Sequence, residues 1–150
     1  MTAPPQAPLP KDTVGALQQA LAAEHAAIWT YGLLSAFLTG KHAQSAAGYE
    51  TAHRALRDST ERLLRDSGAS PDAAAASYVP PKPVTDSASA MAAAVAAESD
   101  ATTAWLAVLE RTDNASLRRT ALDALTSAAV RQTRWRMAVG TSPAGIALPG

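Results

Sequence analysis

The stretch AAEHAAIWTYG, residues 22–32, aligns without gaps on AAESDATTAWL, residues 96–106. The alignment pairs two glutamates and two aromatic residues, Glu24 with Glu98 and Tyr31 with Trp105. Each glutamate stands on a stripe of mainly apolar residues that recur every three or four positions, which is the spacing of one helix face. The repeat therefore predicts two similar helices, each with one carboxylate in the middle of its inward face.

The rest of the chain is also composed like a helical protein. Alanine is abundant, aromatic residues make up only 5% of the sequence, and β-branched residues do not alternate with polar ones. Capping residues and glycines divide the chain into four helical segments. These are expected at about 13–38, 44–67, 87–111 and 115–139, with caps at Asp12 or Thr13, at Thr85 or Asp86, and at Asp113 or Asn114.

A long connection separates the second and third helices. It reads GASPDAAAASYVPPKPVTD, residues 68–86, and its PPKP segment favours extended backbone over a tight turn. The predicted fold is therefore an all-α four-helix bundle with a long crossover between helices 2 and 3. We expect a single bundle domain over residues 12–140, a disordered tail over 1–11 and a C-terminal tail over 141–150.

Composition excludes several classes of protein. Thirteen basic residues balance thirteen acidic ones, so the broad positive field that nucleic acid requires is missing. No segment has the roughly 20 apolar residues of a membrane span, the proline-rich start lacks the apolar run of a signal peptide, and there is no cysteine. We expect a cytoplasmic protein that binds neither nucleic acid nor membrane. Nucleotide fingerprints and a Ser-His-Asp order are also missing, which leaves hydrolase and kinase functions without support.

A possible metal motif lies in the second helix. Glu50 and His53 stand three residues apart, the spacing with which carboxylate-bridged proteins hold iron or manganese. The alternative is an ordinary polar pair at the edge of the core.

Together with the repeated glutamates, this motif resembles the ferritin-like superfamily, most closely an alanine-rich actinobacterial branch with no assigned function. The likeness covers about residues 13–139. It implies iron or manganese ligands at Glu24, Glu50, His53 and Glu98. The fourth helix departs from the superfamily pattern because it has no Glu-x-x-His, only Asp123 three residues before Thr126, and Gln132 further on. A second metal would therefore be poorly held.

Helix depth argues against shared coordination. With the expected helix ends, Glu24 lies fourteen residues before Leu38 and Glu50 only six after Gln44. At a rise of about 1.5 Å per residue, the two carboxylates would then be about 12 Å apart along the bundle. The residues expected level with Glu24 and Glu98 include Arg57 and Arg131, respectively. We therefore hypothesise that these arginines replace metals as partners of the buried glutamates.

Two functions remain open. The first is a metal-free, self-associating binding or structural module with a degenerate metal site, for which no cofactor is expected and a homo-oligomer is the expected assembly. The protein partner, if there is another, is unknown. The second is a carboxylate protein that binds iron or manganese and acts as an oxidoreductase, with Asp123 or Gln132 completing a weaker position.

Overall fold

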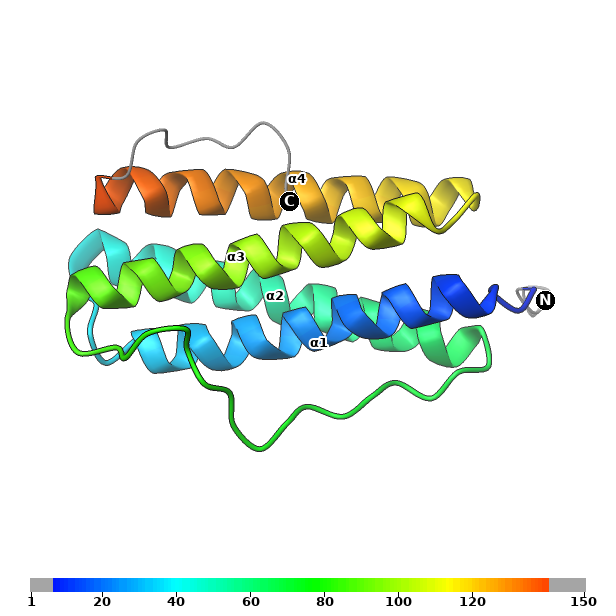
Figure 1. The fold of residues 1–150 in the computed structure, drawn as a ribbon, viewed down its shortest axis with the longest axis horizontal. Coiled ribbons are helices and arrows are strands. Elements are labelled where there is room, and N and C mark those ends of the chain that lie inside the picture. The colour runs from blue at the N-terminus through cyan, green and yellow to red at the C-terminus, as the bar shows by residue number, and fades with distance from the viewer. Residues whose placement is uncertain (1–6, 141–150) are drawn as a thin grey trace.

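Four long helices run side by side along the molecule (Figure 1). They are α1 (Lys11–Leu34), α2 (Gly40–Asp66), α3 (Ser87–Glu110) and α4 (Ala115–Val139). The computed structural model describes residues 7–140, and this part of the chain contains no strand. The predicted all-α four-helix bundle is thereby confirmed. Residues 1–6 of the expected N-terminal tail and the whole expected C-terminal tail, 141–150, lie outside the described residues.

The long connection runs back along the bundle, as predicted. Figure 1 shows α1 antiparallel to both α2 and α3, and the connection returning beside α1 to the end at which α3 begins. As a result α2 and α3 run parallel to each other. Helix α1 packs on α2 and α3, and α4 packs mainly on α3. This arrangement brings the middle of α1 and the middle of α3 face to face.

The caps of the last two helices follow the sequence closely. The Asp86 carboxylate accepts a hydrogen bond from the Ser89 amide at 2.7 Å, and the Ser89 hydroxyl accepts one from the Asp86 amide. Asn114 caps α4 by accepting a hydrogen bond from the Leu117 amide. Such side chains satisfy amide groups that have no partner inside the helix, and both caps were among the predicted alternatives.

The predicted turn between the first two helices was wrong by about four residues on each side. Helix α1 ends at Leu34, after which tight turns continue the chain, with the Phe37 amide donating to the Leu34 carbonyl. Leu38 is buried without being helical, so apolar spacing continued past the helix end. Gly40 has a φ of 55°, and α2 starts at this glycine rather than at Gln44.

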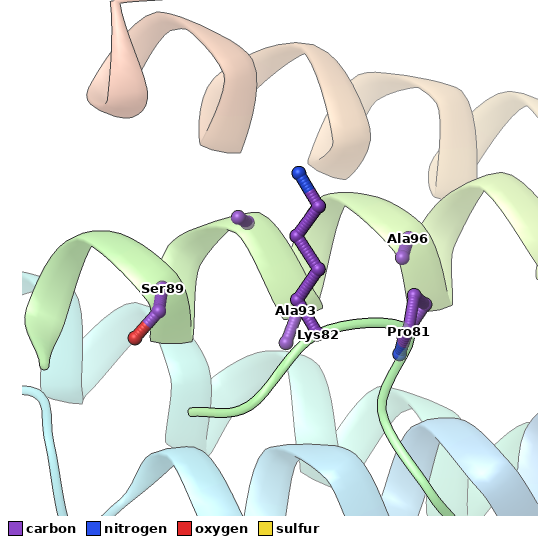
Figure 2. Close-up of a pocket in the computed structure, with 6 residues that line it drawn as sticks. Pro81, Lys82, Ser89, Ala93 and Ala96 are labelled. Atoms are coloured by element: carbon purple, nitrogen blue, oxygen red, sulfur yellow. The ribbon is translucent and has the colours of Figure 1, made fainter. Parts of the chain in front are cut away.

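Where it approaches α3, the connection borders a shallow hollow. Figure 2 shows Pro81 and Lys82 of the connection beside Ser89, Ala93 and Ala96 of α3. The hollow has a volume of about 280 Å³ and its walls are mainly apolar. Its polar side chains are those of Lys82 and Ser89, and the Ser89 hydroxyl belongs to the cap of α3.

The apolar core is divided into two clusters by polar residues. One cluster includes Leu17, Leu21, Leu64 and Trp105, and the other includes Tyr31, Leu34, Met91 and Trp135. Between them, Glu24, His53 and Glu98 are each 0% exposed to solvent. A fully buried group of ionisable side chains is costly unless its members compensate one another, so this group is the candidate functional site.

Candidate functional site

His53 of α2 connects the two repeated glutamates. Its Nδ1 lies 2.6 Å from Glu24 Oε2 on α1, and its Nε2 lies 3.0 Å from Glu98 Oε1 on α3. Both ring nitrogens must carry protons to donate to both carboxylates, so the imidazole is a cation in this arrangement. The two carboxylates are held at opposite edges of the ring.

The aromatic residues of the repeat bond to the glutamates in a reciprocal way. Trp105 Nε1 of α3 donates to Glu24 Oε1 of α1 at 2.8 Å, and the Tyr31 hydroxyl of α1 donates to Glu98 Oε1 of α3 at 2.7 Å. Trp135 Nε1 of α4 in turn donates to the Tyr31 hydroxyl at 2.8 Å. Each half of the repeat thus supplies a carboxylate and a donor for the carboxylate of the other half.

Arg131 of α4 completes the group. Its Nε donates to Glu98 Oε1 at 2.8 Å, and its side chain is only 10% exposed. Its guanidinium carbon also lies 5.9 Å from the centre of the Tyr49 ring, a cation–π contact. The prediction that Arg131 would pair with an inward glutamate is confirmed.

The surroundings shift the ionisation of three members of this buried group. For His53, burial acts to lower the pKa, but the hydrogen bonds to Glu24 and Glu98 and their charges outweigh burial and raise it from 6.5 to about 9. For Glu98, burial acts to raise the pKa, but His53 and Arg131 outweigh burial and lower it. Burial and the neighbouring Glu98 raise the pKa of Tyr31. At neutral pH His53 is therefore a cation and Glu98 an anion.

These residues do not fit a metal ion as they stand. The two cations already neutralise the two carboxylates, so a divalent ion would face an arginine and a protonated histidine. Glu98 Oε1 accepts three hydrogen bonds, both oxygens of Glu24 accept one, and the imidazole separates the glutamates. Within residues 7–140, no cluster of three or more His, Asp and Glu side chains is arranged to hold a metal.

Glu50, the remaining residue of the predicted ligand set, lies apart from the other three. Its Oε1 accepts hydrogen bonds from Nε and Nη2 of Arg54, at 3.1 and 2.6 Å, on the outer side of α2. Asp123 and Gln132, which were expected to complete a weaker metal position, do not join the group either. Asp123 is exposed beside a groove between α2 and α4, and Gln132 is buried but forms none of the hydrogen bonds of the group.

The expected partnership between Glu24 and Arg57 was wrong. Arg57 donates through Nε to Asp58 at 2.8 Å, and the partner of Glu24 is His53. The cause is the misplaced turn. With the observed helix ends, Glu24 lies ten residues before Leu34 and Glu50 lies ten after Gly40, so the calculated gap between them disappears.

The four packed helices, the long crossover between α2 and α3, and the central carboxylates define a ferritin-like four-helix bundle. The chain is similar in structure to a ferritin-like diiron-carboxylate protein from Bacillus anthracis, with a TM-score of 0.69 and 14% identity over 86% of this chain and 96% of that one. At this identity the likeness shows the fold alone. Among the described helices, none is both long enough and apolar enough to cross a membrane.

The chain belongs to the family described as a domain of unknown function, DUF4439, whose model matches residues 16–150. It is also similar to a conserved hypothetical protein from Mycobacterium tuberculosis of known crystal structure. That likeness has a TM-score of 0.82 and 38% identity, over 85% of this chain and 96% of that one. No curated protein matches the sequence. The expected ferritin-like branch without an assigned function is therefore confirmed.

Proposed function

We propose that this protein is a metal-free ferritin-like module in which ion pairs take the place of a metal centre, and that it works in the cytoplasm by associating with protein, first of all with a second copy of itself. The observation that carries the proposal is the charge balance of the buried group formed by Glu24, His53, Glu98 and Arg131. Because hydrogen-bond donors already occupy three of the four oxygens of these carboxylates, the group stabilises one arrangement of the helices rather than binding a reactant.

The outer face of α4 supports the association part of the proposal. Leu122, Val130 and Met137 are 50%, 44% and 66% exposed, and their spacings of eight and seven residues place them on one side of the helix. If two α4 helices packed antiparallel about a two-fold axis near Thr126, Leu122 of each copy would face Val130 of the other. Such a self-complementary apolar surface is what a symmetric dimer requires.

Metal analysis tests the first part of the proposal. Protein purified without chelator, offered ferrous iron or manganese without oxygen and then desalted, is expected to retain only trace metal, measured by elemental analysis. Glu98→Gln, which removes one carboxylate charge, should retain the same trace amount. Stoichiometric metal in the natural protein that disappears in Glu98→Gln would overturn the proposal.

Val130→Arg tests the second part. A charged side chain on the apolar face should weaken association at least about tenfold, because it loses the burial of a valine. Sedimentation equilibrium over a range of concentrations measures the change. Val79→Arg, at a valine that is 92% exposed on the crossover, is the matched control and should associate normally. A natural protein that remains monomeric at every concentration would contradict self-association.

One observation favours the second function, a carboxylate site for iron or manganese. Among the side-chain atoms of residues 7–140, Glu98 Oε2 is buried and has no hydrogen-bond partner. A carboxylate oxygen of this kind is an available ligand. Arg131 and the proton on His53 would both have to leave before a divalent ion could share this position, which is why we prefer the metal-free function.

A further inference from the structure

A second cavity, open to solvent, lies on the outer side of α1 and α2, beside the crossover. Its volume is about 490 Å³, within the roughly 300–1,000 Å³ of typical small-molecule sites. Glu50, Arg54 and Arg57 of α2 form one side, and Trp29 of α1 and Tyr78 of the crossover form another. Neither the buried ionic group nor the outer face of α4 contributes to it.

The crossover is fixed to α1 by hydrogen bonds at the edge of this cavity. The side-chain amide of Gln18 donates a hydrogen bond to the Ser70 carbonyl at 2.7 Å and accepts one from the backbone amide of Asp72 at 2.9 Å. His25 Nε2 lies 3.3 Å from the Asp72 carbonyl oxygen. Because these contacts fix the crossover to α1 without a ligand, the wall is formed before any ligand arrives, which lowers the entropic cost of binding.

Two aromatic rings face the cavity from different segments. The ring centres of Trp29 and Tyr78 lie 6.1 Å apart with the planes inclined at 58°. The Tyr78 hydroxyl accepts a hydrogen bond from the Ala75 amide at 3.0 Å, which fixes the orientation of its ring. Together with Ile28 and Leu33, these rings give the cavity a mainly apolar surface that suits a flat aromatic group.

The charged side chains that line the cavity can donate hydrogen bonds to an anion. Two guanidinium groups, of Arg54 and Arg57, line it against the single carboxylate of Glu50. Arg54 uses Nε and Nη2 to bind Glu50, and Arg57 uses Nε and Nη2 to bind Asp58. Nη1 of each guanidinium is therefore left to donate to a ligand, and arginine pairs well with carboxylates.

We propose that this cavity binds a small aromatic carboxylate, with the ring against Trp29 and Tyr78 and the carboxylate on Arg54 and Arg57. The site is independent of the buried ionic group and of self-association. Glu50, which the sequence marked as a metal ligand, acts here by holding the Arg54 side chain through its hydrogen bonds. It is a positioning residue and leaves the contact with the ligand to the guanidinium.

The test is a calorimetric titration of the full chain with 2-naphthoate. We expect one site per chain, and binding of the uncharged 2-naphthamide at least about tenfold weaker, since a charge-assisted hydrogen bond is lost. Arg54→Ala and Arg57→Ala should each weaken naphthoate about tenfold for the same reason. Arg65→Ala is the matched control, because Arg65 pairs with Glu61 at the same four-residue spacing but does not line the cavity.

Each possible result decides the proposal. It stands if naphthoate binds in preference to naphthamide and only the two cavity arginines matter. No measurable heat with naphthoate at millimolar concentration would overturn it, as would equal binding of the amide or an equal loss in Arg65→Ala. The comparison of the two compounds uses the natural chain, so it decides the matter even if a variant were to fold poorly.

Discussion

Replacing Arg131 with leucine is expected to lower the free energy of unfolding by about 3 kcal/mol or more. The change removes the guanidinium that donates to Glu98 Oε1 at 2.8 Å and leaves the carboxylate, which is 0% exposed, with an uncompensated charge. Arg131 is one of only two cations in the buried group, so no neighbour can substitute for it. Urea unfolding followed by circular dichroism measures the loss.

Two further variants separate this effect from a simple loss of packing. Arg134→Leu, on the same helix, removes an exposed side chain that donates to the Tyr49 hydroxyl at 3.2 Å and should cost about 1 kcal/mol or less. Adding Glu98→Gln to Arg131→Leu removes the stranded charge and should recover part of the lost stability. Equal stability of Arg131→Leu and the natural protein would show that the buried ion pair does not stabilise the fold.

The stability of the natural protein is expected to fall by about 3 kcal/mol as the pH rises from 6.5 to 9. The pKa of His53 is raised in the folded chain from 6.5 to about 9, because its hydrogen bonds to Glu24 and Glu98 and the charges of these carboxylates outweigh the effect of burial. The stabilisation is complete below pH 6.5, where both the folded and unfolded chains hold the proton. It is lost as the pH rises through about 9, where the folded chain releases it.

The control for this pH dependence is His53→Gln, which removes the titrating group while keeping a polar side chain. Its stability should be lower than that of the natural protein and nearly constant between pH 6.5 and 9. His42→Gln, which alters a half-buried ring 6.1 Å from Trp135, should leave the fall unchanged. A fall that persisted in His53→Gln would assign the pH dependence to another group.

At acid pH, the contribution of Glu98 to stability changes in the opposite direction, because it falls as the pH falls. The pKa of Glu98 is lowered from its ordinary value of 4.5, since His53 and Arg131 stabilise the charged carboxylate. The stabilisation from the charged Glu98 carboxylate is complete above pH 4.5. It is lost as the pH falls through the lowered pKa of Glu98 in the folded chain. Maximum stability is therefore expected between about pH 4.5 and 6.5.

Much of the fold was predictable because it depends on local signals. The caps Asp86 and Asn114 act on amides three residues away, and the proline-rich crossover excludes a tight turn by its own backbone preferences. The end of α1 was not predictable in this way. Leu38 continues the apolar spacing but lies in a turn, and the reversal at Gly40 depends on how the two helices pack.

The candidate site was predictable in part for the same reason. The two glutamates stood out because each interrupts an apolar stripe. The pairing of Arg131 with Glu98 could be predicted because the two residues were expected at the same level along the bundle. Glu50 and His53 lie near the same helix face, yet residues three apart differ by about 60° around the helix axis, which is enough to bury His53 and leave Glu50 partly exposed. The signal for Tyr31 and Trp105 was present in the repeat, but their hydrogen bonds required knowledge of how α1 and α3 face each other.

The sequence by itself determined four helices, their long crossover and the presence of two inward carboxylates, because periodicity, capping and backbone preference act over a few residues. Only the tertiary structure decided which cation meets which carboxylate. Relative depth and rotation of separate helices set the contact of Glu24 with His53 rather than Arg57. A shift of one helical turn, about 5.4 Å, exchanges one partner for another, and that shift is fixed by packing across the whole bundle.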